Sequence, residues 1–129
     1  GCKLNDPEPA YYISATIDNK SWKYEGNNYF ASSSGSYSKI FIVAVYPDDN
    51  TALTFTTSTP LRSAPATLNI DYGEYYIGLP NSYYVSSGTC NVTKFDGRTV
   101  EGTFSFDAVS SGSGGAIRVK DGKFRLMYD

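Results

Sequence analysis

The sequence contains no histidine, only two cysteines, and a single tryptophan and methionine. Histidine is the commonest general base near neutral pH and the commonest metal ligand, so its absence removes most sites of both kinds. The two cysteines, Cys2 and Cys90, form neither a CxxC redox motif nor a thiolate metal site. We therefore predict no catalytic residue, no metal site and no cofactor, in a protein that is not an enzyme.

Basic clusters and long apolar runs are also missing. The 13 acidic and 11 basic residues give a net charge of −2, whereas nucleic-acid binding depends on Lys and Arg neutralising phosphates. No apolar run approaches the ~20 residues that span a membrane. We expect no nucleic-acid partner, and we expect any membrane attachment to be covalent or through another protein.

What the sequence has in plenty is tyrosine and other residues that favour strands. Aromatic residues make up 16% of the 129 residues, and twelve residues are tyrosine. From residue 11 onward, short alternating segments are separated by turn residues, about nine strands at roughly 8–12-residue spacing. This pattern predicts one all-β domain over residues 11–129. We expect an antiparallel β-sandwich of about nine short strands or, alternatively, a flattened up-and-down β-barrel.

The last third of the chain predicts hairpins. Residues 99–107 alternate most regularly, with Val100, Gly102, Phe104 and Phe106 on one face and polar residues on the other. The preceding pair, residues 96–97 (Asp-Gly), predicts a type I′ turn. A second Asp-Gly pair, residues 121–122, predicts a closing hairpin between segments AIRVK and KFRLMY.

Four segments of the chain resemble small secreted lipoproteins of Bacteroidetes type: ATIDNKSW, GTCNVT, VEGTFSF and VKDGKF. That family shares an A-x-I-[DN]-G-K-x-[WF] opening and a V-x-G-T-F-x-F close. This chain departs from the pattern at Asn19, where Gly is usual, and at Cys90, where a β-branched residue is usual. The resemblance implies an all-β fold in the periplasm or at the cell surface, lipid-anchored to the outer membrane. It implies no catalytic residue.

The two cysteines have separate predicted roles. Residues 1–10 are polar and contain two prolines, which favours a tether rather than part of the core. A bacterial lipoprotein is cleaved immediately before a cysteine that then receives a diacylglycerol group, so we predict lipid attachment at Cys2. Cys90 is explained as a buried thiol that acts as a small apolar residue. The alternative is a disulfide between the two, contributing ~4 kcal/mol in the chain-entropy model.

The segment DYGEYYIGLPNSYY, residues 71–84, holds five of the tyrosines. Strand alternation places Tyr75 on the face opposite its neighbours in the sequence, and Tyr83 and Tyr84 on opposite faces from each other. An aromatic ring can lie against the C–H surface of a sugar while carboxylates bind its hydroxyls. The residues predicted to bind a ligand are Tyr72, Glu74, Tyr76 and Tyr84.

This segment predicts a non-catalytic binding module for carbohydrate. Two alternatives stay open: the rings pack within the sheet, or the protein is a structural or accessory component that contacts another envelope protein. Acid pairs such as Glu74 with Asp71, or Glu101 with Asp107, match the needs of a glycosidase only if they lie ~5–10 Å apart. The turn at residues 48–50 (Asp-Asp-Asn) has too few oxygen ligands for an ordered calcium loop.

Overall fold

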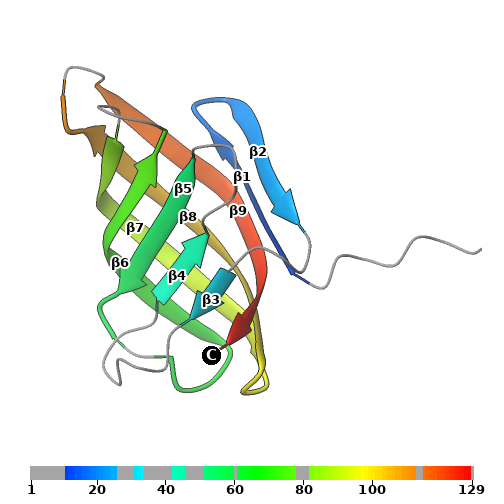
Figure 1. Cartoon of the computed structure of the whole chain (residues 1–129). Coiled ribbons are helices and arrows are strands. Elements are labelled where there is room, and N and C mark those ends of the chain that lie inside the picture. The colour runs from blue at the N-terminus through cyan, green and yellow to red at the C-terminus, as the bar shows by residue number, and fades with distance from the viewer. Residues whose placement is uncertain are drawn as a thin grey trace, which may run out of the picture.

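The computed structural model describes residues 11–25, 31–33, 42–45, 51–59, 61–77, 82–112 and 115–128 (Figure 1). These ranges contain strands, turns and bends but no helix, so no helix within them could cross a membrane. The all-β prediction is confirmed. The strands are β1 (Tyr12–Ile17), β2 (Lys20–Glu25), β3 (Ala31–Ser33), β4 (Ile42–Val45), β5 (Ala52–Thr57), β6 (Ala66–Tyr76), β7 (Ser82–Phe95), β8 (Thr99–Ser110) and β9 (Ala116–Tyr128).

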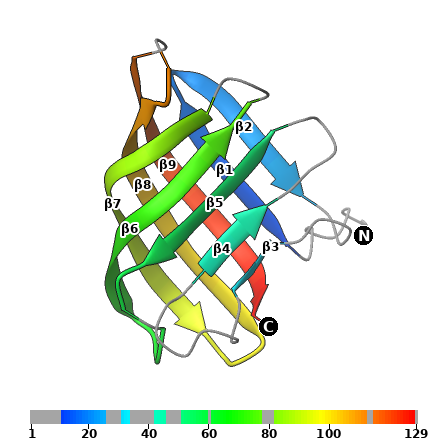
Figure 2. The same cartoon turned by 60° about the vertical axis from the view of Figure 1, so that its left-hand side comes forward.

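These strands form one curled sheet. Their order is β2-β1-β9-β3-β4-β5-β6-β7-β8, and β8 pairs in addition with β9. Strands β3 and β9 are parallel, while the other pairs are antiparallel. Because β8, the last strand in this order, also pairs with β9, the sheet curls back on itself, and β3, β4 and β5 face β7 and β8 (Figures 1 and 2). The predicted sandwich of two packed sheets is not confirmed in the described ranges.

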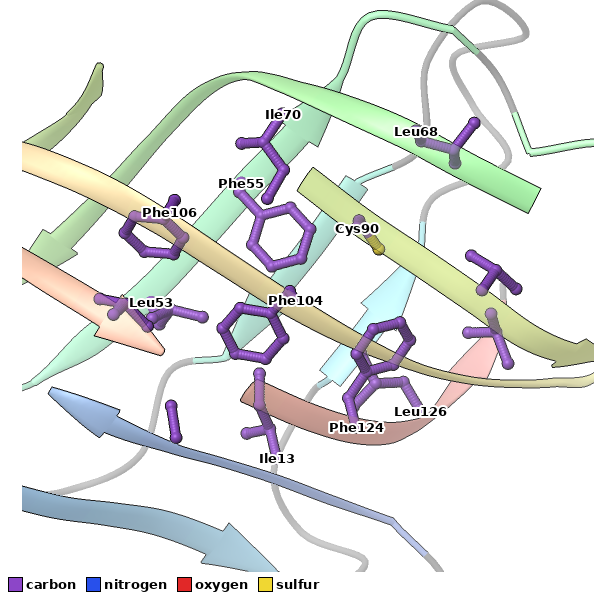
Figure 3. Packing of buried hydrophobic residues seen from close by; sticks show 14 of the residues in the cluster. Ile13, Leu53, Phe55, Leu68, Ile70, Cys90, Phe104, Phe106, Phe124 and Leu126 are labelled. Atoms are coloured by element: carbon purple, nitrogen blue, oxygen red, sulfur yellow. The ribbon is translucent and has the colours of Figure 1, made fainter. Parts of the chain in front are cut away.

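The core lies on the concave side of this sheet. In β1, buried residues alternate with half-buried ones, and β5 and β8 repeat the same period of two. Phe55 and Phe104 meet in the centre with ring centroids 5.3 Å apart, close to the Cys90 thiol (Figure 3). Each fully buried aromatic or aliphatic side chain contributes roughly 1.5–3 kcal/mol, so the alternating inward residues provide most of the stability.

Four core phenylalanines lie opposite glycines on neighbouring strands. A side chain at any of these glycines would collide with its neighbours; a Cβ at Gly122, for example, would lie 2.6 Å from a ring carbon of Phe104. Large rings therefore fill the space that the glycines leave empty, which lets the sheet curl tightly. The cross-strand pairs are Phe55–Gly73, Phe106–Gly88, Phe104–Gly122 and Phe124–Gly102.

The predicted closing hairpin at residues 121–122 is wrong. Strand β9 runs without interruption from Ala116 to Tyr128, and both of its halves pair with β8. The register shifts between Phe104 and Phe106, and Asp121 adopts a left-handed φ of 54°. The Asp-Gly pair therefore forms a β-bulge within one strand, because the second half of β9 continues along the same partner.

The predicted type I′ turn at residues 96–97 is also wrong in type, although the hairpin itself is present. The backbone N–H of Asp96 donates to the carbonyl of Thr99, so the two central residues are Gly97 and Arg98. Only Gly97 of these two has a positive φ, 90°, which is the pattern of a type II′ turn. The Asp96 carboxylate accepts hydrogen bonds from the N–H groups of Arg98 and Thr99, and these bonds lower its pKa.

Candidate functional site

The four predicted binding residues lie on two neighbouring strands and point away from the core. Three of them alternate along β6, and the middle one, Glu74, lies directly opposite Tyr84 of β7. Their sequence neighbours Tyr75 and Tyr83 form the adjacent cross-strand pair and pack against the core. Because side chains alternate along a strand, the four predicted residues face outward. We call them the tyrosine face: Tyr72, Glu74, Tyr76 and Tyr84.

The members of the tyrosine face differ in exposure. Tyr72 is 58% exposed and Tyr84 is 37% exposed, whereas Tyr76 and Glu74 are half-buried. Their inward neighbour Tyr75 meets the buried Trp22 edge to face, with ring centroids 6.3 Å apart. The predicted alternation, with Tyr75 on the face opposite its neighbours and Tyr83 opposite to Tyr84, is confirmed, and the structure adds which face is exposed. Among the described residues, neither the two exposed hydroxyls nor the Glu74 carboxylate has a hydrogen-bond or ion-pair partner.

An extra residue in β6 sets the direction of this face. Ile70 is buried, yet Tyr72, two positions further on, is exposed. The register between β5 and β6 shifts at Thr56, which lies opposite Tyr72 and leaves Asp71 unmatched. Such a bulge reverses the alternation of side chains. The Asp71 carboxylate accepts a hydrogen bond of 3.2 Å from the Thr56 hydroxyl, which holds the bulged residue at the surface.

The flanking strands extend the same outward surface. Thr54 of β5 lies opposite Glu74, and Val109 of β8 lies opposite Tyr84. Val109 is 48% exposed, so an apolar side chain lies beside one exposed ring. The surface thus combines aromatic, apolar, hydroxyl and carboxylate groups across four adjacent strands.

An open groove of about 930 Å³ adjoins the tyrosine face over strands β6 to β9. We call it the polar groove. Its neutral side chains occupy the outward positions of β6, β7 and β8, whose inward positions hold core residues. The sequence predicted the polar side of β8 but not the groove, because the groove depends on the pairing of distant strands. The neutral polar residues are Asn69, Ser87, Thr89, Asn91, Thr103 and Ser105.

Five charged side chains complete the polar groove. Strand β9 supplies Arg118, Lys120, Asp121 and Lys123, and β8 supplies Asp107. The guanidinium Nε of Arg118 donates to Asp107 Oδ1 at 2.9 Å. Three cations and two acids leave a local charge of +1 in a chain of net charge −2. In the part of the chain that the structure describes, neither lysine side chain has a hydrogen-bond or ion-pair partner.

The groove and the tyrosine face are continuous. Asp107 in the groove is two residues from Val109, which lies opposite Tyr84. Two residues along a strand cover about 7 Å. Ser87 of the groove lies on the same strand as Tyr84, three residues further on. A single extended ligand could therefore contact both surfaces.

One carboxylate pair considered from the sequence, Glu101 with Asp107, is not brought together. Glu101 and Asp107 lie six residues apart on one strand, which is roughly 20 Å and beyond the separation used by glycosidases. Each lies beside its own cation, with Arg125 Nε 3.6 Å from Glu101 and Arg118 Nε 2.9 Å from Asp107. This strand holds two separate surface ion pairs rather than an acid–base pair.

Cys90 is a free thiol that is fully buried. Burial raises its pKa to about 12, so almost none of the nucleophilic thiolate is present near neutral pH. No group of three or more acids and cysteines in the described ranges could hold a metal ion. The predicted lipid-attachment residue Cys2, the tether 1–10 and the turn at residues 48–50 lie outside the described residues.

Comparison with protein-family models, with curated proteins and with solved structures finds no match for this chain. The resemblance to secreted lipoproteins therefore stays a prediction from four sequence segments. The candidate site depends on the geometry and chemistry of its own residues.

Proposed function

We propose that this chain is a non-catalytic binding module for carbohydrate and that the tyrosine face is its ligand surface. One observation carries the proposal: the rings of Tyr72 and Tyr84 are exposed on the same side of the sheet, and Glu74 lies between them. Tyrosine rings usually pack inward in strands and leave only the hydroxyl wet. An outward pair beside a carboxylate favours a ligand that is apolar on its faces and polar at its edges.

Sugars have this chemistry. The axial C–H groups of a pyranose ring form an apolar patch that lies against an aromatic face. Its equatorial hydroxyls donate to a carboxylate, and an ionised carboxylate only accepts hydrogen bonds. Glu74 supplies such acceptors between the two rings. The arrangement binds a sugar without any acid–base step.

The first test is affinity electrophoresis of the protein through gels that contain different polysaccharides. We expect one polysaccharide to retard the protein, and Tyr72→Ala or Tyr76→Ala to weaken binding at least tenfold, about 1.4 kcal/mol. Tyr72→Phe, which keeps the ring, should retain most of the affinity. Met127→Ala is the matched control, because Met127 is a comparably exposed apolar residue, 44% exposed, on β9.

The alternative function is a structural or accessory protein that contacts another envelope protein. The exposed Val109 beside Tyr84 favours it, because adjoining exposed apolar groups also mark protein interfaces. Failure of every polysaccharide to retard the wild-type protein would overturn the carbohydrate proposal and favour this alternative.

We also propose that Cys2 carries a lipid that anchors the protein to the outer membrane, in the periplasm or at the cell surface. The support is the polar tether sequence around Cys2, together with a Cys90 thiol that is free and buried. Intact-mass measurement of protein extracted from native membranes should show an added diacylglycerol on Cys2. The unmodified mass, or a mass two hydrogens lower from a disulfide, would refute the anchor.

A further inference from the structure

We propose that the polar groove binds a carboxylated glycan, with the uronic-acid carboxylates at Lys120 and Lys123 and the sugar hydroxyls on the neutral side chains. This inference deepens the proposed function and rests on it. It names the ligand class and adds a second contact surface to the tyrosine face.

The floor of the groove suits free hydroxyls. Asn69, Thr89 and Ser105 lie in register across three strands, and Asn91 and Thr103 form the neighbouring row. The hydroxyl and amide groups of these residues both donate and accept hydrogen bonds. A polymer with alternating donors and acceptors along its edges is the complementary ligand.

Asn91 is held in place for this role. Its Oδ1 accepts a hydrogen bond of 2.8 Å from the Thr67 hydroxyl. That bond fixes the amide plane on the sheet surface and leaves the amide NH₂ without a partner among the described residues. The fixed donor lies in the same row as Thr103 and, one strand further, Lys123.

The cationic wall of the groove supplies the charge preference. Lys123 pairs with Thr103 across β8 and β9, and Lys120 precedes the bulge at Asp121. Arg118 is neutralised by Asp107, so two ammonium groups face one remaining acid. Anionic groups on a ligand are attracted to these two lysines.

The two acids in the groove make it favour a ligand with widely spaced negative charges over one with closely spaced charges. Asp107 and Asp121 accept hydrogen bonds and repel dense negative charge. A heavily sulfated chain or a nucleic acid carries closely spaced anionic groups and few hydroxyl donors next to them. A uronic-acid polymer has spaced carboxylates and free hydroxyls, so it can meet both lysines and both acids.

The dimensions fit an oligosaccharide. Neighbouring strands lie ~4.8 Å apart, so the four strands under the groove span roughly 14 Å, and a volume of about 930 Å³ is within the range of ligand sites. One end of the groove reaches Tyr84 along β8, where Asp107 is two residues from Val109, and Val109 lies opposite Tyr84. A chain lying in the groove can therefore place its last ring on the tyrosine face.

The experiment compares two polymers that share a backbone, polygalacturonate and its methyl ester, as ligands of the full chain in affinity electrophoresis. We expect at least fivefold stronger retention by polygalacturonate. The double variant Lys120→Gln/Lys123→Gln should lose three- to tenfold in affinity, about what two exposed ionic contacts provide. Arg98→Gln removes one exposed positive charge at the β7–β8 turn, outside the groove, and should bind like the wild type.

Three outcomes would overturn the inference. Equal binding of both polymers, lost on Tyr72→Ala but not in the lysine variant, would leave the proposed function standing and remove the groove from it. No binding of either polymer or of any neutral polysaccharide would overturn both proposals. Competition by dextran sulfate as strong as that of polygalacturonate would show a general polyanion surface instead of a glycan groove. Raising the salt concentration should weaken wild-type binding more than that of the lysine variant, since salt screens exposed charges.

Discussion

Glycine is the residue that allows aromatic rings to fill this core. At Gly122 a Cβ atom would lie 2.5 Å from the carbonyl oxygen of Phe104 and 2.6 and 2.7 Å from two carbons of its ring. The carbonyl belongs to the paired strand β8 and cannot move without disturbing the sheet. The absence of a side chain at this residue is therefore part of the packing of Phe104.

This packing makes Gly122→Ala strongly destabilising. Inserting a methyl group into a filled core costs about 1–3 kcal/mol in free energy of unfolding, and here the obstacle includes backbone. Gly112→Ala is the matched control, because a Cβ at Gly112 meets no atom within 4 Å and its φ is not in the left-handed region. The control should stay within about 0.5 kcal/mol of the wild type.

Urea unfolding of the two variants measures the difference through the midpoint at constant m-value. Equal midpoints for Gly122→Ala and Gly112→Ala would contradict the close approach of Phe104 to Gly122.

At the scale of the elements, local sequence patterns predicted the faces of strands better than their ends. The alternation in residues 99–107 predicted the inward and outward sides of β8, and the burial of Phe104 and Phe106 agrees with it. The same reasoning placed Tyr75 opposite to the tyrosine face. Side-chain alternation is a local property of the backbone, so the sequence contains all that is needed to predict it.

The Asp-Gly pair at residues 121–122 shows where local patterns fail. A positive φ and a small residue serve a hairpin turn and a β-bulge equally well. The outcome depends on whether the residues after Gly122 fold back to pair with residues 116–120 or continue along β8. They continue along β8. Nothing within β9 itself distinguishes the two, since the deciding partner lies in another part of the chain.

The two candidate surfaces differ in the same way. That Tyr72, Glu74 and Tyr76 share one face could be predicted because they alternate on one strand, but their exposure could not. The polar groove could not, because Asn91, Thr103 and Lys123 become neighbours only through the registers of β7, β8 and β9. Sites built across strands require long-range pairing, which single-strand patterns do not contain.

At the scale of the whole molecule, the residues that stabilise the fold and the residues proposed to bind ligand lie on opposite sides of the curled sheet. The concave side holds the buried residues, including Phe55, Cys90 and Phe104 (Figure 3). The convex side holds the tyrosine face and the polar groove. Variants of Tyr72 or Lys123 should thus change ligand affinity without changing the unfolding midpoint, which is what makes the binding experiments interpretable.

The buried thiol of Cys90 makes the stability of the folded protein depend on pH. An exposed cysteine ionises near pH ~8.5, whereas burial raises the pKa of Cys90 to about 12. Below pH ~8.5 the thiol is protonated in both states and has no effect on stability. Between ~8.5 and about 12 the unfolded chain loses this proton while the folded chain keeps it, so the unfolded state binds fewer protons and stability falls as the pH rises.

We expect this group alone to lower the free energy of unfolding by about 2 kcal/mol between pH 8 and pH 10, at up to about 1.4 kcal/mol per pH unit. Tyrosines and lysines titrate in the same range, so the measurement is the difference in slope between the wild type and Cys90→Ala, from urea unfolding at several pH values. The variant is expected to be less stable at pH 7, because it loses buried volume, but to decline less steeply above pH 8.5. Parallel slopes would mean that the thiol ionises in the folded protein as easily as in the unfolded chain, and that water reaches the centre of the curled sheet.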